Sequence, residues 1–314
     1  MIYYEQPKEH ISRKLLVACI LGGWFGLHKF MQKKIFSGIL YLFTFGLFFV
    51  GWFKDIKSFT DTIQLQNQHN AYVLEEMERE AEEKKRRQER EAARKRVIQR
   101  KMEETNSKIS AIPSCDINFD LDNKLSRNTV SSFPEIKLAP VGKKFDTTKI
   151  SSFVVVDIET TGLSAAKDRI CQLSAILYVD GEPVQSFNTF INPKKNISLE
   201  ASKINGITDE MLESAPTLEE VANSFLQFIG NRPIVGYNLV FDLKFLYCSG
   251  IDIFNKRKFY DAYILAKKVY STYDYKLVTV ANDIGIYYDA HNSLADCWAA
   301  GCVFLDEVQT ITNP

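Results

Sequence analysis

The chain has no closely spaced pair of cysteines. Its six cysteines are scattered over 314 residues without a C-x-x-C pair or a dense framework. This excludes a disulfide scaffold and a structural zinc site, and it is typical of a protein whose soluble part lies in a reducing cytosol. Histidine is also scarce: His10, His28 and His69 lie in the N-terminal third, and His291 is the only other one.

The chain also lacks a net charge, but this neutrality is a cancellation. Lys+Arg and Asp+Glu number 39 each, while residues 1–60 carry +5, residues 61–147 carry +1 and residues 148–314 carry −6. The three segments therefore differ in character, and the length allows about two domains. A hydrophobic content of 46% excludes a wholly disordered chain.

Two uncharged runs dominate residues 1–60. Residues 15–27 are uncharged for 13 positions and residues 35–53 for 19, and the longer run would span about 28 Å as a helix, close to the roughly 30 Å hydrocarbon core. A short basic segment separates the runs, so we predict a two-helix transmembrane hairpin that contacts lipid through residues 15–53. The first run could instead be a signal peptide, although no small-residue cleavage site follows it, or a re-entrant or interfacial helix.

Basic residues around the hairpin predict its orientation. Five lysines and arginines flank its two ends and three lie in its turn. This excess favours both ends inside. We therefore expect a multi-pass membrane protein with the C-terminal part of the chain in the cytoplasm.

The hairpin also resembles a known family. Residues 22–30 (GGWFGLHKF), Gly38, Gly46 and residues 52–55 (WFKD) are similar to the two-transmembrane ("TM-two") hairpin domain. The sequence departs from that family directly after the first stretch, where Met-Gln replaces the usual Tyr-Leu. The resemblance implies a membrane topology and says almost nothing about biochemical function.

Residues 61–104 form a charged arm. Within residues 75–104, 21 of 30 side chains are charged, and glycine and proline are absent. This composition, with favourable pairs such as Glu82–Arg86, predicts a long helix. The heptad spacing of apolar residues fails after its first turns, so we predict a solvated single helix and not an oligomerising one.

The charge of the arm is polarised along its length. Residues 84–101 carry ten basic and two acidic side chains. They could contact anionic lipid or nucleic acid, or they could simply suit the dipole at the C-terminal end of a solvated helix. Residues 105–147 are rich in Ser, Asn and Asp and contain three prolines, so we predict a flexible tether.

Residues 148–314 are predicted to form an α/β domain with a mixed sheet flanked by helices. Residues 153–156 are continuously apolar, which is typical of a strand buried on both faces. Residues 170–179 and 184–191 flank an Asp-Gly-Glu-Pro turn and predict a hairpin. Five helical stretches follow, over residues 217–229, 242–249, 261–270, 277–284 and 293–308.

The first predicted strand ends in Asp157-Ile158-Glu159. Residues two apart on a strand share a face, so both carboxylates can point at one spot. Such a pair repels itself unless a cation joins it. Alone the pattern is weak, because it usually marks a solvated strand end, but here Thr-Thr-Gly follows and permits a tight turn.

The extended motif is more specific. Residues 154–163 (VVVDIETTGL) resemble the first motif of the DEDDh 3′–5′ exonucleases, a family that includes the polymerase III epsilon subunit and RNase T. Its second and third motifs are matched by residues 236–246 (GYNLVFDLKFL) and 291–296 (HNSLAD), and the resemblance covers residues 150–310. Tyr237 replaces the His of many members and Ser293 replaces a common Ala. No Tyr lies four residues before Asp296, which excludes the tyrosine subclass.

The resemblance implies an RNase H-like fold and a set of functional residues. Asp157, Glu159, Asp242 and Asp296 would hold two ions of Mg²⁺ or Mn²⁺, which suit carboxylate oxygens. His291 would accept the proton of the attacking water. By the same analogy the terminal nucleotide would be bound by four residues, Thr160, Leu163, Asn238 and Phe241.

The leading hypothesis is thus a membrane-tethered, metal-dependent enzyme. It would hydrolyse single-stranded nucleic acid from its 3′ end to nucleoside 5′-monophosphates, with DNA expected in preference to RNA. The alternative is a non-catalytic, membrane-anchored scaffold that binds nucleic-acid ends or a protein partner. The retention of all four acids and of His291 counts against the scaffold.

Overall fold

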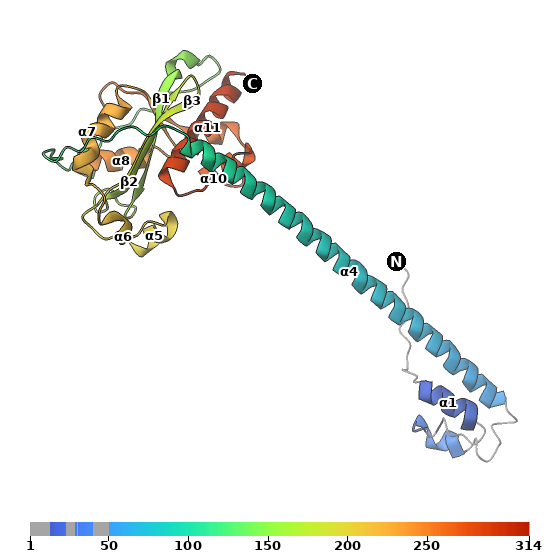
Figure 1. Ribbon diagram of the computed structural model, residues 1–314. Coiled ribbons are helices and arrows are strands. Elements are labelled where there is room, and N and C mark those ends of the chain that lie inside the picture. The colour runs from blue at the N-terminus through green and yellow to red at the C-terminus, as the bar shows by residue number, and fades with distance from the viewer. Residues whose placement is uncertain (1–12, 23–28, 30, 40–49, 314) are drawn as a thin grey trace. The chain divides into compact units, whose positions relative to one another are not determined.

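The computed structural model describes residues 13–22, 29, 31–39 and 50–313 (Figure 1). The chain divides into two compact units, residues 1–94 and residues 95–314. Helix α1 (Arg13–Gly22) lies in the first unit, and helix α4 (Val50–Ser110) begins there. The elements that follow are η2 (Val130–Ser132), η3 (Thr147–Ile150), β1 (Ser152–Thr160), β2 (Ile170–Val179), β3 (Glu182–Phe190), α5 (Leu199–Asn205), α6 (Asp209–Leu212), α7 (Leu218–Ile229), β4 (Ile234–Gly236), α8 (Val240–Cys248), β5 (Phe259–Asp261), α9 (Ala262–Val269), α10 (Leu277–Asp283) and α11 (Ser293–Thr312).

The first unit contains a small apolar cluster between α1 and the start of α4. Cys19 and Phe59 are buried at its centre. The indole Nε1 of Trp52 donates a hydrogen bond to the backbone oxygen of Cys19 at 2.6 Å, and Lys29 forms an ion pair with Asp55 at 2.9 Å. The hydrogen bond from Trp52 and the apolar cluster hold α1 against α4.

The predicted transmembrane runs lie partly outside the described residues, because residues 23–28, 30 and 40–49 are not among them. Within the part of the chain that is described, no helix is both long enough and apolar enough to cross a membrane.

Helix α4 contains the whole predicted helical arm and is longer than predicted at both ends. It begins within the second apolar run and continues to Ser110. The predicted pair Glu82–Arg86 is present at 2.9 Å, one helical turn apart on the exposed surface. Such a pair adds only a few tenths of a kcal/mol, so helix propensity over the whole arm accounts for its continuity.

The prediction of a flexible tether over residues 105–147 is wrong. The backbone N–H of Cys115 donates to Ser186 on β3 at 2.8 Å, and that of Ala139 donates to Phe259 on β5 at 2.8 Å. These are the two edge strands of the sheet, and the segment pairs with some of their free backbone groups. The apolar side chains of this segment are spaced too irregularly to show a period. They nevertheless pack into the cores on both faces of the sheet, and examples are Ile112, Phe133, Leu138 and Val141.

A mixed sheet of five strands forms the centre of the second unit. Its order is β3-β2-β1-β4-β5, with β1–β2 and β2–β3 antiparallel and β1–β4 and β4–β5 parallel. The mixed sheet, the hairpin and all five predicted helices are confirmed, with bounds that differ by a few residues. The short strands β4 and β5 and the small helices α5 and α6 were not predicted.

Helices cover both faces of this sheet (Figure 1). Alternate residues of β1 face two different cores: Phe153 and Val155 pack with α9, α10 and α11, while Val154 and Val156 pack with α7 and α8. This explains the uninterrupted apolar run of β1, since a strand covered on both faces has no solvent side. The same alternation places the next odd-numbered residues, 157 and 159, on the side of α11.

The packing of α11 on β2 leaves no room at Gly301. A methyl group there would overlap the phenol ring of Tyr178, which is 1% exposed and stacks on Phe153 at a centroid distance of 5.0 Å. We expect Gly301→Ala to lower the free energy of unfolding by about 1–3 kcal/mol, measured by urea denaturation. Gly142→Ala is the control, because nothing lies within 4 Å of its added methyl group. Equal stability of the two variants would contradict this packing argument.

Candidate active site

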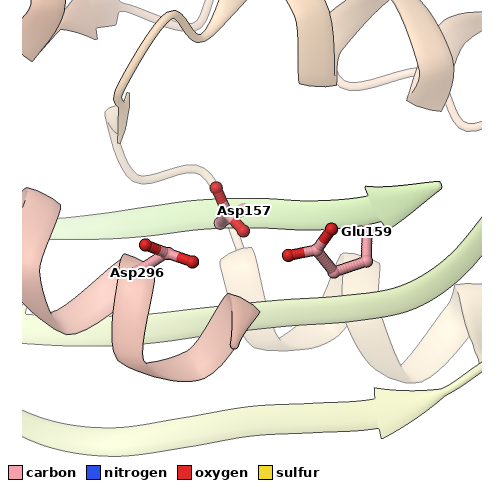
Figure 2. Close-up of side chains that lie close together, drawn as sticks. All are labelled: Asp157, Glu159 and Asp296. Carbon is pink, nitrogen blue, oxygen red and sulfur yellow. The ribbon is translucent and has the colours of Figure 1, made fainter. Parts of the chain in front are cut away.

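Three carboxylates converge where β1 meets the start of α11. Asp157 and Glu159 project from β1, and Asp296 lies in the first turn of α11 (Figure 2). One oxygen from each of the three lies within 4.8 Å of the others. The structure therefore brings together three of the predicted metal ligands from positions up to 139 residues apart.

Asp242, the fourth predicted ligand, lies in the first turn of α8 and is 4% exposed. Its Oδ1 accepts a hydrogen bond from the backbone N–H of Ile158 at 3.1 Å. The residue is thus attached to β1 between the two carboxylates of that strand. It is not part of the three-carboxylate cluster, but its charge raises the pKa of Asp157.

Burial raises the pKa of every carboxylate at this site, and repulsion within the site adds to it at Asp157, Glu159 and Asp242. Burial has the largest effect on Asp157 and moves its pKa well above the ordinary range, and the neighbouring acids add to it. Burial, reinforced by the charge of Asp296, raises the pKa of Glu159 to about 7. Burial also raises the pKa of Asp296 to about 6. At neutral pH these groups therefore need protons or a cation.

The donor set fits a divalent cation. In the described part of the chain, no lysine, arginine or histidine forms an ion pair with any of the four carboxylates. Charged oxygens that are partly desolvated and form no ion pair are the ligands that hard cations such as Mg²⁺ and Mn²⁺ prefer. Asp157, Glu159 and Asp296 could share one such ion, and Asp242 lies next to them.

This electrostatic arrangement predicts how stability depends on pH. An acid whose pKa is raised by folding is more protonated in the native state, so its contribution to stability is complete below its unfolded pKa and is lost as pH rises through its folded pKa. For Glu159 that window runs from about 4.5 to about 7. We expect the metal-free protein to melt at a lower temperature at pH 8 than at pH 5, and Mg²⁺ or Mn²⁺ to reverse the loss at pH 8.

Thermal melts of the full chain in a chelator and in excess metal measure both effects. Glu159→Gln removes one titrating group, so its metal-free melting temperature should fall less between pH 5 and pH 8. Glu307→Gln is the matched comparison. Burial also raises the pKa of Glu307, in this case to about 10, but Glu307 lies away from the cluster. The electrostatic account is wrong if Glu159→Gln keeps the full slope, or if metal stabilises Glu159→Gln as strongly as the parent.

Two further donors orient Asp296. The hydroxyl of Tyr288 donates to its Oδ1 at 2.8 Å, and the backbone N–H of His291 donates to its Oδ2 at 3.0 Å. His291 has a φ of 67°, a left-handed conformation that directs this N–H at the carboxylate. The His291 side chain is exposed, so the imidazole lies at the surface of the site.

The predicted nucleotide-binding residues lie in two cavities that flank the cluster. Thr160, Leu163 and Phe241 line a cavity of about 570 Å³ together with Glu159, and Leu163 is 86% exposed at its rim. Asn238 lies instead in a second cavity of about 590 Å³, together with two other site residues, His291 and Asp296. The carboxylates therefore lie between two hollows.

Several interactions at the site were not predicted. Tyr288 lies eight residues before Asp296 in a loop, where no periodic pattern marks it. Asn205 forms a side-chain hydrogen bond that lowers the pKa of Glu159 against the larger effect of burial. Asp261 accepts hydrogen bonds from the backbone N–H groups of Asn238 and Tyr263, both at 3.0 Å, and so fixes the loop before α8.

The two unusual motif residues have structural partners. The hydroxyl of Tyr237 donates to the backbone oxygen of Tyr275 at 2.6 Å, and both residues line the second cavity. Ser293 is fully buried, and its hydroxyl lies 2.5 Å from that of Ser174 on β2. Ser293 thus links the start of α11 to the sheet, next to the carboxylate of Asp296.

An α/β domain with buried carboxylates converging between a strand and a helix is an acidic, cation-binding type of active site. Comparison with known families makes this more specific. Residues 154–304 match the family described as Exonuclease (RNase_T), and residues 12–56 match the TM2 domain. The chain therefore contains a domain similar to exonucleases, which supports an enzyme of the nuclease class, together with a region similar to TM2 domains.

Relatives of the exonuclease domain include much larger proteins. The chain is 37% identical over 147 residues to a DNA polymerase III PolC-type of Clostridium perfringens, covering 46% of this chain and 10% of that protein. It is also 37% identical over 165 residues to a DNA polymerase III PolC-type of Thermotoga petrophila, covering 51% of this chain and 12% of that protein. The chain thus spans about a tenth of the length of these relatives.

Matches among solved structures are more distant. Exonuclease X in complex with 5′-overhanging duplex DNA has 19% sequence identity and a TM-score of 0.41, covering 51% of this chain and 98% of that one. An E. coli exonuclease I complex with single-stranded DNA has 21% identity and a TM-score of 0.43, covering 52% and 41%.

Proposed function

We propose that the protein is a metal-dependent 3′–5′ exonuclease of the DEDDh type. The observation that carries this proposal is the convergence of Asp157, Glu159 and Asp296 within a domain that matches the Exonuclease family. Asp242, attached to Ile158, and His291, attached to Asp296, complete the five-residue set. Asp242 is held beside the cluster by its carboxylate, and His291 is held there by its backbone N–H.

The four carboxylates would hold two ions of Mg²⁺ or Mn²⁺. When bound, such ions neutralise the phosphate and stabilise the charge on the attacking and leaving oxygens. The protein's own contribution is to hold the carboxylates close together against their repulsion, and Tyr288 and the His291 N–H fix the orientation of one of them. The exposed imidazole of His291 would take a proton from water on the solvent side of the site.

The two cavities would hold the strand on either side of the scissile phosphate. Thr160, Leu163 and Phe241 would contact the terminal nucleotide in one cavity. Asn238 and His291 would contact the strand on the other side. The names of the PolC-type relatives favour DNA over RNA as the substrate.

Degradation of end-labelled oligonucleotides by the full-length protein tests this function. With Mg²⁺ or Mn²⁺, 5′-labelled single-stranded DNA should shorten one nucleotide at a time from its 3′ end, and a chelator should stop the reaction. Parallel RNA and mismatched-duplex substrates would establish the preference. Absence of a ladder on every substrate, or equal activity in Asp157→Ala, would refute the proposal.

We also propose that residues 12–56 tether the enzyme to a membrane, with the exonuclease domain in the cytoplasm. The support is the TM2 match together with the two uncharged runs of residues 15–27 and 35–53. Extraction of membranes with alkaline carbonate should leave the full chain in the pellet, and a protease added outside intact cells should not cleave it. Release into the supernatant would refute integral insertion.

A further inference from the structure

The basic stretch of α4 at residues 95–101 belongs to the same unit as the active site. The unit begins at Lys95, and α4 enters the domain core through Ile109, near its end. About two turns before Ile109, the ammonium of Lys101 lies 5.1 Å from the ring centre of Tyr287, a cation–π interaction. This part of α4 is therefore fixed to the nuclease domain at two places along its length.

Two consecutive tyrosines connect this helix to the site. Tyr287 contacts Lys101, while Tyr288 is 5% exposed and donates its hydroxyl hydrogen bond to Asp296 at 2.8 Å. Three residues further along, His291 lines the cavity that also contains Asp296. A single short loop, residues 287–291, thus has the basic helix at one end and the proposed reaction centre at the other.

The charges along this stretch complement those of the domain. Residues 95–101 contain four basic side chains and no acid, and all four are exposed. Residues 148–314, in contrast, carry a charge of −6 and include the four carboxylates of the site. A polyanionic strand therefore gains little electrostatic attraction from the domain alone. We name the four side chains the arm patch: Lys95, Arg96, Arg100 and Lys101.

An existing ion pair does not prevent binding by the arm patch. Arg100 pairs with Glu104 at 3.1 Å, but its side chain is 82% exposed. An exposed pair of this kind contributes about 0–1 kcal/mol, so a phosphate can replace the carboxylate at little cost. A phosphate group also matches the forked guanidinium of Arg.

We propose that the arm patch binds the sugar–phosphate backbone of a single strand whose 3′ end lies in the active site. The proposal rests on the proposed exonuclease function and adds the path of the strand on its 5′ side. Binding to phosphates carries no base specificity, so the arm patch would increase affinity for long substrates of any sequence. A dinucleotide has a single phosphodiester, which would lie at the reaction centre, and so leaves no phosphate for the arm patch.

The test compares a long and a short substrate in the full-length protein. The variant replaces all four residues of the arm patch with Gln. We expect its KM for a 20-nucleotide single-stranded DNA to rise about 10-fold or more at low salt, while kcat/KM for a dinucleotide stays unchanged. The slope of log KM against log salt should become shallower by about 0.7 for each phosphate that the variant no longer neutralises.

The control variant removes the same number of charges from four exposed lysines of the segment after α4, which line neither cavity: Lys124, Lys137, Lys143 and Lys144. It should keep the parental KM for both substrates. The proposal would be overturned if the arm-patch variant lost as much kcat/KM on the dinucleotide as on the 20-mer, or if its KM for the 20-mer did not rise. Loss of binding to phosphatidylserine vesicles without loss on the 20-mer would also overturn it, in favour of a lipid site.

Direct binding separates this proposal from the proposed function. Fluorescence anisotropy of a labelled 20-mer in a chelator measures affinity without turnover, and the arm-patch variant should bind at least several-fold more weakly. If the parent cleaves neither substrate, the exonuclease function fails. In that case equal anisotropy of parent and variant would overturn the arm patch as well, and weaker binding by the variant would support it.

Discussion

Replacing Asp157 by Asn is expected to reduce nuclease activity by at least about 10³-fold while making the metal-free protein more stable. The activity falls because Asp157 is the most buried acid of the three-carboxylate cluster and the one most strongly affected by the others. The stability rises because an amide of the same shape removes a carboxyl group that folding must bury and protonate beside three other carboxylates. Initial rates on labelled single-stranded DNA and thermal melts in a chelator measure the two effects.

The opposite signs of these effects distinguish a metal ligand from a structural residue. Mg²⁺ or Mn²⁺ should raise the melting temperature of the parent and should do so much less in Asp157→Asn. Asp283→Asn is the control, since that side chain is exposed at the end of α10 and should change neither quantity. A variant that loses activity because it unfolds, or one that is still stabilised by metal as the parent is, would remove Asp157 from the proposed set.

Much of this domain could be predicted from the sequence because its signals are local. The apolar run of β1, the turn between β2 and β3 and the amphipathic helices each depend on neighbouring residues. The convergence of Asp157, Glu159 and Asp296 was predictable only through the family resemblance, because the strand and the helix that carry them are far apart in sequence. The strand geometry alone pairs Asp157 with Glu159 and cannot place Asp296 beside them.

Other features could not be predicted, and each depends on residues distant in sequence. The segment after α4 has the composition of a flexible tether, yet its backbone pairs with both edge strands of the sheet. An edge strand is defined by the completed sheet, so no local pattern shows that a partner is needed there. Tyr288 is a similar case, because its hydrogen bond to Asp296 depends on the path of a loop and not on a helical or strand period.

The left-handed backbone of His291 was also invisible in the sequence, and it determines how that residue can be tested. Its N–H holds Asp296, while its exposed side chain makes the proposed proton transfer. A substitution must therefore remove the imidazole and keep the backbone. Asn adopts left-handed conformations more readily than other non-glycine residues, whereas Ala would add strain of about 1 kcal/mol.

We expect His291→Asn to lower kcat by about 10²–10⁴-fold, the range typical of a lost general base. The melting temperature and the stabilisation by Mg²⁺ or Mn²⁺ should stay close to those of the parent, because the bond to Asp296 comes from the backbone. If His291→Asn keeps more than about a tenth of kcat, or loses its response to metal, His291 acts by holding Asp296 and another group accepts the proton.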